Sequence, residues 1–194
     1  MFSFRIFTES KADIKFLKDY IYAVFNIQLS DDDFDPLGSW SGYKTSGVLK
    51  ASIKQNNDDS KRNILILDAD TDFTLRNQEV MNDFAAFNVP ISLFLFPNNN
   101  SSGSLETLLC EIAVEKKILT CFEGYETCVT GYEAPVIKSK VFADLDALLP
   151  ANQKKNDAND LIQDKNRNYR NVNHWNLHHD YLAQLRKFLQ PIII

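Results

Sequence analysis

The feature that most constrains the fold is a short apolar run that ends in aspartates. Residues 64–67 read Ile-Leu-Ile-Leu, and Asp68, Asp70 and Asp72 follow at alternate positions. An uninterrupted apolar run of this length is typical of a strand buried on both faces, as in parallel sheets covered by helices on each side. The run therefore predicts an α/β protein in which a central strand ends at a group of carboxylates.

Strand and helix patterns alternate on both sides of this run. Residues 2–7 alternate apolar and polar side chains as a strand does, and residues 11–25 repeat apolar side chains at helical spacing after Ser10, which can cap the first turn. The later pattern predicts a helix over 75–87, a strand over 89–96 and a helix over 105–114, which Ser104 can cap. This alternation predicts parallel strands joined by right-handed crossovers.

The rest of the chain is expected to be mostly helical. Residues 48–53 fit a short helix or a strand, and we favour the helix; a short strand is also expected near Trp40. Further helices are predicted over 118–129, 139–149 and 175–189, with a long loop over 151–173. We expect a mostly parallel sheet of about four strands in an α/β domain over 1–149. A basic, Asn-rich loop and a C-terminal helix, over 150–194, would pack on the same domain.

Charge is distributed unevenly along the chain. Residues 1–150 contain 14 Lys and Arg against 22 Asp and Glu, a net charge of −8, whereas residues 151–194 contain 7 against 4, a net charge of +3. The average surface of the larger part would repel a polyanion. Contact with nucleic acid therefore requires bound cations, local basic patches or a partner protein.

The cysteines and the hydropathy pattern bear on the compartment. The three cysteines, Cys110, Cys121 and Cys128, have no CxxC spacing, so neither a disulfide framework nor a zinc knuckle is expected. The first residues lack the basic and apolar regions of a signal peptide, and no later segment approaches the length of a membrane span. We therefore expect a cytoplasmic protein with no membrane partner.

Acidic residues follow two of the predicted strands. Glu9 comes after the first strand, and Asp68 and Asp70 come at the end of the central strand. In an open parallel sheet, ligands bind outside the carboxyl ends of the strands. Clustered carboxylates repel one another unless a cation lies between them, and Mg²⁺ or Mn²⁺ prefers such oxygen ligands. The pattern predicts a divalent-metal site, although Asp68 and Asp70 could instead cap the next helix, which is the better interpretation for Asp72.

Three motifs together carry a resemblance to a known family. FRIFTESKADIKFLKDYI contains Glu9 and Asp13, ILILDADTDF contains Asp68 and Asp70, and FLFPNNNSSGSLETLL contains Glu106. Over about residues 1–149 the chain resembles the Toprim-like domains of topoisomerases, primases, recombination-repair proteins and overcoming-lysogenization-defect nucleases. The last motif is similar to that of a compact, largely uncharacterised branch of this family.

This resemblance implies a Rossmann-like Toprim fold and Mg²⁺-dependent phosphoryl transfer, as in a nuclease acting on DNA or RNA. It implies that Asp68 and Asp70 hold Mg²⁺ (or Mn²⁺) and that Glu9 is a metal ligand or a general acid/base. Asp13 and Glu106 would hold a second metal.

Two lysines and two departures from the family pattern complete this interpretation. Lys138 and Lys140 are candidates for neutralising charge on the phosphate, and a solvated helix end is the alternative explanation. Ser10 stands where many relatives have Gly, and Gly103 stands where some nuclease relatives have Ser. Retention of the fold with loss of catalysis is therefore an open alternative.

Two other functions remain open at this point. The first is a non-catalytic module that binds metal or a phosphorylated ligand and serves a partner protein such as an ATPase. The second is a phosphohydrolase in which Asp68 attacks phosphorus and Asp70 protonates the leaving group.

Several weaker signals have ordinary structural explanations as well. Lys11, Asn98 and Asn99 are candidate substrate-binding residues, and turn chemistry alone explains the asparagines equally well. The segment 154–170 could follow a phosphate backbone with Tyr169 stacking on a base, or could be a solvated loop. Finally, His174, His178 and His179 form a metal cluster by composition, but a packing role for their helix is favoured.

Overall fold

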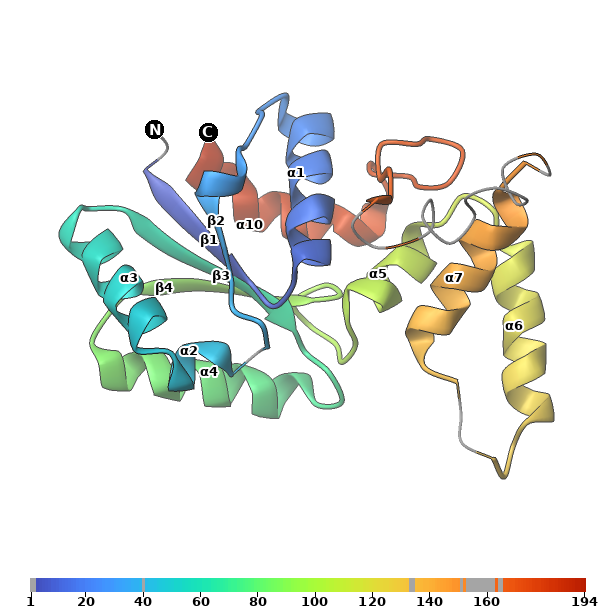
Figure 1. Ribbon diagram of the computed structural model, residues 1–194, viewed down its shortest axis with the longest axis horizontal. Coiled ribbons are helices and arrows are strands. Elements are labelled where there is room, and N and C mark those ends of the chain that lie inside the picture. Colours follow the sequence, from blue (N-terminus) through green and yellow to red (C-terminus); the bar gives the residue numbers. More distant parts are fainter. Residues whose placement is uncertain (1–2, 40, 133–134, 151, 153–162, 164–165) are drawn as a thin grey trace.

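The computed structural model describes residues 3–39, 41–132, 135–150, 152, 163 and 166–194. The described residues contain one four-stranded, all-parallel sheet with the strand order β2-β1-β3-β4 (Figure 1). The strands are β1 (Phe4–Thr8), β2 (Phe34–Pro36), β3 (Arg62–Asp68) and β4 (Ile91–Phe96). The predicted α/β class with a parallel sheet is confirmed, and the fold is Rossmann-like.

Helices cover both faces of the sheet (Figure 1). One face carries α1 (Lys11–Phe25), α5 (Leu105–Ile112) and α10 (Ala183–Ile193). The opposite face carries α2 (Gly42–Thr45), α3 (Gly47–Asp58) and α4 (Phe73–Phe87). Two helices, α6 (Lys117–Cys128) and α7 (Ile137–Leu148), pack against each other beside α5. Single turns of 3-10 helix are found at η1 (Asp31–Asp33) and η3 (Asp180–Leu182). Within the described residues, no helix is both long enough and apolar enough to cross a membrane.

The apolar run of β3 shows why the sequence folds this way. Ile64 and Ile66 belong to the core under α1, α5 and α10, whereas Leu65 and Leu67 belong to the core under α3 and α4. All four side chains are fully buried. Because alternate residues of a strand point to opposite faces, a central strand between two helix layers must be apolar at every position.

The connections define where a ligand site is expected in this topology. From β1 the chain crosses through α1 to β2 on one side, and from β3 it crosses through α4 to β4 on the other side. The two crossovers therefore leave the neighbouring strands β1 and β3 in opposite directions and on opposite faces. This arrangement opens a crevice at the carboxyl ends of β1 and β3, which is the usual binding position in such sheets.

Several expectations about the first half of the chain are confirmed, and one differs in position. Ser10 caps α1 in a capping box with Asp13, and the ambiguous segment 48–53 is helical, within α3. The short strand expected near Trp40 is found earlier, as β2, while Trp40 itself lies outside the described residues. The strand forms at Phe34 because its aromatic side chain is buried in the core beneath α1.

The C-terminal helix begins later than predicted. The periodic pattern predicts a helix from Trp175, but α10 starts at Ala183, after a series of turns. Side chains hold these turns: Asn176 Oδ1 accepts a hydrogen bond from His178 N at 3.0 Å, and His179 Nδ1 accepts one from Tyr181 N at 3.1 Å. Such local side-chain bonds compete with helical backbone bonds. Beyond them, α10 packs on the sheet as expected, with the ring of Phe188 5.4 Å from that of Phe94.

Candidate metal centre

A cavity of about 330 Å³ lies at the carboxyl ends of β1 and β3. Four carboxylates from separate parts of the sequence line it, together with two lysines; its lining residues are Glu9, Ser10, Lys11, Ala12, Asp13, Asp68, Glu106 and Lys138. The structure thus brings together Glu9, Asp68, Asp13 and Glu106, four of the five predicted metal ligands. The cavity lies in the crevice that the sheet topology creates.

The strand ends fix two of the carboxylates directly. Glu9 follows β1, and its Oε1 accepts a hydrogen bond from the backbone N of Asp68 on the neighbouring strand at 2.9 Å. Asp68 ends β3, and its Oδ1 accepts a hydrogen bond from Leu105 N, the first residue of α5, at 2.9 Å. These two bonds connect β1, β3 and α5 at a single point.

Helix N-termini fix the other two carboxylates. Asp13 is buried in the first turn of α1, where its Oδ2 accepts a hydrogen bond from Ser10 N at 2.8 Å. Glu106 lies in the first turn of α5, where its Oε2 accepts a hydrogen bond from Ser104 Oγ at 3.0 Å. The partial positive charge at a helix N-terminus favours a carboxylate in each position.

Crowding of the carboxylates changes their proton affinity. Burial raises the pKa of Asp13 to about 7, and the negative charges of Glu9 and Glu106 add to this effect. Burial also raises the pKa of Asp68 to about 9, with further contributions from the charges of Asp13 and Glu9. In the absence of a cation, protons relieve the repulsion; a divalent cation in the cavity would relieve it instead and favour the ionised form.

The two predicted phosphate-neutralising lysines have different surroundings. Lys138, in the first turn of α7, lines the carboxylate cavity. Lys140 does not line it; its Nζ donates a hydrogen bond to Glu123 Oε1 of α6 at 2.9 Å and lies 3.8 Å from Glu126 Oε2. Lys140 therefore connects α6 to α7, which is a structural role that its sequence position did not indicate.

Asp70 is the predicted metal ligand that the structure does not bring to the cavity. Its carboxylate forms an ion pair with Arg76 of α4 and is largely exposed. Its backbone adopts a left-handed conformation, with φ of 52°, and forms two hydrogen bonds with Gly103, of 2.9 and 2.7 Å. With these contacts, Asp70 is not among the residues that line the cavity. The interpretation of Asp72 as a helix cap is confirmed, since its Oδ1 accepts a hydrogen bond from Leu75 N at 2.9 Å.

The structure explains why glycine stands at position 103, where the Toprim-like motif that the sequence resembles can have serine. The φ of Gly103 is +135°, a conformation that other residues rarely adopt. A Cβ atom at this position would lie 2.7 Å from Thr107 Oγ1, which is too close. Serine would therefore not fit here without a shift of the loop before α5. The other departure, Ser10, is the N-cap of α1, and its hydroxyl accepts hydrogen bonds from Ala12 N and Asp13 N.

The two asparagines proposed as substrate contacts hold their own loop. Asn98 Oδ1 accepts hydrogen bonds from Asn100 N at 3.1 Å and Ser101 N at 3.0 Å. Asn99 has φ of 59°, and its Oδ1 accepts a hydrogen bond from Leu95 N at 3.0 Å. Neither residue lines the carboxylate cavity. Turn chemistry therefore accounts for both residues in this structure.

The prediction that Tyr169 stacks on a nucleic-acid base is wrong. Tyr169 is fully buried, with its ring 5.3 Å from that of Phe16 and 6.1 Å from that of Trp175. The backbone N of Tyr169 donates to Asp19 of α1 at 3.1 Å, which anchors this segment on the core. Most of the basic stretch before it, residues 153–162 and 164–165, lies outside the described residues.

Among the described residues, no group of three or more His, Cys, Asp or Glu side chains forms a ready-made set of metal ligands. The three histidines lie in the turns before α10 and not on a packed helix as expected: His179 caps a turn, and His174 contacts Asn171. For the four cavity carboxylates, one oxygen of each is held by a hydrogen bond from the protein. A carboxylate has two oxygens and about four lone-pair sites, so one hydrogen bond positions each group without using up its capacity to bind a cation.

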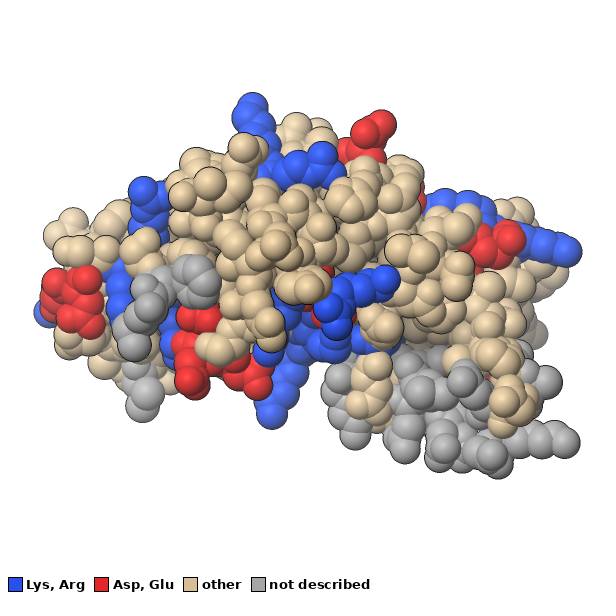
Figure 2. Space-filling view, turned by 90° about the horizontal axis from the view of Figure 1, so that it is seen from above, with Lys and Arg blue, Asp and Glu red and all other residues tan. Residues whose placement is uncertain are grey.

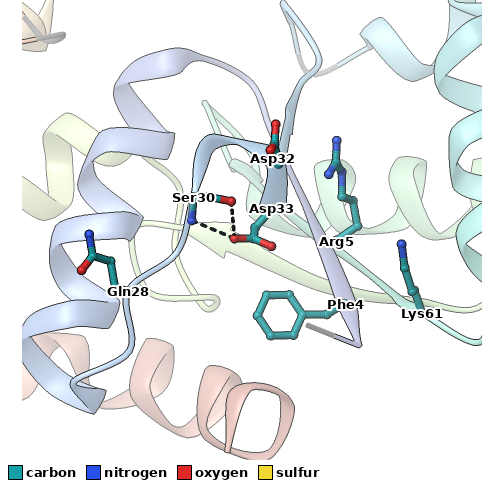
Figure 3. A pocket seen from close by; sticks show the side chains of 7 residues that line it. All are labelled: Phe4, Arg5, Gln28, Ser30, Asp32, Asp33 and Lys61. Carbon is teal, nitrogen blue, oxygen red and sulfur yellow. Dashed lines mark hydrogen bonds between the residues drawn. The ribbon is translucent and has the colours of Figure 1, made fainter. Parts of the chain in front are cut away.

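A different cavity, of about 620 Å³, lies at the opposite edge of the sheet, where β1 and β3 begin (Figure 3). Two of its charged side chains, Asp33 and Arg5, are paired with other groups. Asp33 Oδ2 accepts hydrogen bonds from Ser30 N and Oγ at 2.8 and 2.9 Å, and Arg5 forms two hydrogen bonds with Asp35 of 2.7 and 2.9 Å. This pairing leaves the amino edge with less unbalanced charge than the carboxyl edge.

Comparison of the chain with protein-family models, with curated proteins and with solved structures finds no match. The residues of the cavity and the three motifs that resemble Toprim-like domains are therefore the features from which a function can be inferred.

Proposed function

We propose that this chain is a Mg²⁺-dependent phosphoryl-transfer protein of the Toprim-like type that acts on nucleic acid as a nuclease. The observation that carries the proposal is the convergence of Glu9, Asp13, Asp68 and Glu106 with Lys11 and Lys138 in one cavity at the topological switch point. Carboxylates hold divalent cations, and lysines neutralise phosphate. The carboxylates alone support a metal site, and the motif resemblance supplies the choice of nucleic acid.

The side chains present fit a hard divalent cation. Asp68, Asp13 and Glu106 offer oxygen ligands on three separate elements, and the repulsion among them is relieved by positive charge. When bound, such a cation would stabilise negative charge on a phosphoryl oxygen and increase the acidity of a bound water.

The chain's own groups would perform the remaining steps. Glu9 is in position to accept a proton from an attacking water as a general base, since it lies between the strand ends and lines the cavity. Lys138 and Lys11 enter the cavity from α7 and α1 and would neutralise the phosphate from two sides. Lys140 has no part in this proposal because it joins α6 to α7.

Cleavage of labelled DNA and RNA, each single-stranded and double-stranded, tests this function in Mg²⁺ and in Mn²⁺. We expect metal-dependent cleavage by the wild type and a loss of about 100-fold or more in Asp68→Ala and in Glu9→Ala. Asp32→Asn is the matched control, because Asp32 is an exposed carboxylate at the opposite edge of the sheet. Equal activity of the wild type and the two cavity variants would refute the mechanism.

A second candidate function is a non-catalytic module that binds a metal or a phosphorylated ligand for a partner such as an ATPase. The hydrogen bonds that already hold one oxygen of each cavity carboxylate favour it. A crystal grown with Mn²⁺ separates the two functions. One or two ions among Glu9, Asp68 and their neighbours would support the nuclease, whereas a cavity still closed by side-chain hydrogen bonds would support the module.

The aspartate-nucleophile phosphohydrolase has less support. It requires Asp70 to protonate the leaving group next to Asp68, but the Asp70 carboxylate pairs with Arg76 outside the cavity. Trapping of a phosphoaspartate at Asp68 would restore this candidate.

A further inference from the structure

A second cavity, of about 490 Å³, lies beside the carboxylate cavity on the outer side of α1. Its lining residues are Lys11, Ile14, Lys15, Lys18, Asp31, Phe34 and Pro36. Lys11 lines this cavity and the carboxylate cavity, so the two are neighbours at the N-terminus of α1. We call this second cavity the α1 lysine groove. It lies between α1 and β2, and β2 is an outermost strand of the sheet.

The lysines of this groove form a stripe along the helix. Positions 11, 15 and 18 are four and three residues apart, so their side chains lie on one face of α1. Lys11 and Lys18 are separated by ~10 Å along the helix axis, a length over which one nucleic-acid strand presents more than one phosphate. Figure 2 shows Lys and Arg side chains gathered over the middle of the molecule on a face that also exposes acidic side chains.

The groove has a charged rim and a partly apolar wall. Ile14, Phe34 and Pro36 contribute apolar atoms, and the three ammonium groups lie alongside them. A phosphate backbone is complementary to this combination, because its negative charges alternate with sugars that have apolar surface. The net charge of the whole chain is −5, so a local patch of this kind is what a polyanion would need in order to bind.

Two of the lysines now form ion pairs that a phosphate could replace. Lys18 Nζ lies 2.8 Å from Asp31 Oδ1, and the Asp31 side chain is 88% exposed, so breaking this pair costs little. Lys15 pairs with Asp19 of the same helix. Asp19 would keep other partners, since it also accepts a hydrogen bond from Tyr169 N and lies 3.5 Å from Arg170 Nε.

We propose that the α1 lysine groove binds the backbone of a single nucleic-acid strand and leads that strand into the carboxylate cavity. This inference rests on the proposed function and adds the path of the substrate. Lys11 contacts the phosphate at the entrance to the cavity, and Lys15 and Lys18 contact the phosphates that follow. Contacts of this type give affinity without sequence preference.

Binding of a fluorescently labelled single-stranded oligonucleotide, measured by anisotropy in Ca²⁺ at several salt concentrations, tests this path. Each phosphate contact contributes about 0.7 to the slope of log affinity against log salt for a single strand. We expect Lys15→Gln/Lys18→Gln to reduce the slope by about 1.4, and to weaken binding about 20-fold near 0.1 M salt. The control is Lys54→Gln/Lys187→Gln, which removes two exposed helical lysines outside the groove and should leave both quantities unchanged.

The outcomes separate this inference from the function on which it rests. If the wild type cleaves nucleic acid but the groove variant binds the oligonucleotide as the control does, the path is refuted and the proposed nuclease function is not. Wild type that fails to bind any oligonucleotide would also refute the path. Salt-dependent binding that the groove variant loses would support the path even if no cleavage is detected, because the anisotropy measurement requires no turnover. Thermal melting of both double variants confirms that each is folded.

Discussion

Acidic residues have different surroundings at the two edges of the sheet, the amino edge where the strands begin and the carboxyl edge where they end. At the amino edge, Arg5 binds Asp35 through two hydrogen bonds, and Asp33 accepts from Ser30. At the carboxyl edge, carboxylates gather with one another, and their mutual repulsion adds to the rise in the pKa of Asp68 caused by burial. The amino edge is electrostatically balanced by the protein, whereas the carboxyl edge is balanced only when a proton or a cation is added.

This difference indicates that the carboxylates at the carboxyl edge lower the stability of the fold. Groups that stabilise a fold are paired, as at the amino edge, and like charges held together at a cost are a feature of functional sites. The backbone hydrogen bonds to Glu9, Asp13 and Asp68 keep the carboxylates in place in spite of that cost.

The largest expected effect is on the pH dependence of stability without metal. The pKa of Asp68 is raised to about 9 in the folded chain, above its value in the unfolded chain, so folding retains a proton. The resulting stabilisation is fully present at acidic pH and is lost as the pH rises toward 9. The free energy of unfolding should fall by up to about 1.4 kcal/mol per pH unit from this proton.

Denaturant unfolding of the wild type and Asp68→Asn from pH 6 to pH 9 measures this effect. The wild type should lose stability relative to Asp68→Asn as the pH rises, because asparagine has no charge to acquire. Asp32→Asn, at the amino edge, should follow the wild type. Parallel curves for the wild type and Asp68→Asn would mean that the carboxyl edge is not under electrostatic strain.

A smaller effect is expected from placing a serine at Gly103, where some Toprim-like nucleases have one. Gly103→Ser places a side chain on a residue with φ of +135° and against Thr107, so we expect a loss of about 1 to 3 kcal/mol in the free energy of unfolding. Gly47→Ser is the control, since a Cβ atom there meets nothing within 4 Å. If both variants melt at the wild-type temperature, the loop before α5 is more adaptable than its backbone conformation indicates.

The smallest effect is expected at Asp70. Because its carboxylate pairs with Arg76 outside the cavity, Asp70→Ala should change the Mg²⁺ dissociation constant by less than about threefold, or ~0.6 kcal/mol. Calorimetric titration measures this directly beside the wild type. Complete loss of binding would show that Asp70 leaves Arg76 and turns into the cavity when the metal binds.

The sequence predicts the elements whose signals are local. β3 can be predicted because four consecutive apolar side chains need two covered faces. The helix α1 can be predicted from its periodicity and from its cap at Ser10. The meeting of Glu9 with Asp68 is also predictable, since neighbouring parallel strands end at the same edge. The proximity of Asp13 and Glu106 to this pair is implied by the resemblance to Toprim-like motifs and not by spacing alone.

The missed features depend on contacts between distant residues. Asp70 does not line the cavity; its backbone pairs with Gly103, more than thirty residues later, and no local pattern encodes this pairing. Tyr169 lies among polar and basic residues in the sequence, yet it is buried against Phe16 of α1. The sequence around Lys140 is that of a solvated helix end, but in the fold Lys140 forms an ion pair with Glu123 of α6. In each case the deciding partner is brought close only by the complete fold.

Mn²⁺ titration by isothermal calorimetry at neutral pH tests most directly the claim that the carboxyl edge binds a divalent cation. Wild type and Asp32→Asn should give the same saturable binding, and Asp68→Asn should give none or be weakened by more than about tenfold. The contradicting result would be no binding by the wild type, or equal binding by the wild type and Asp68→Asn.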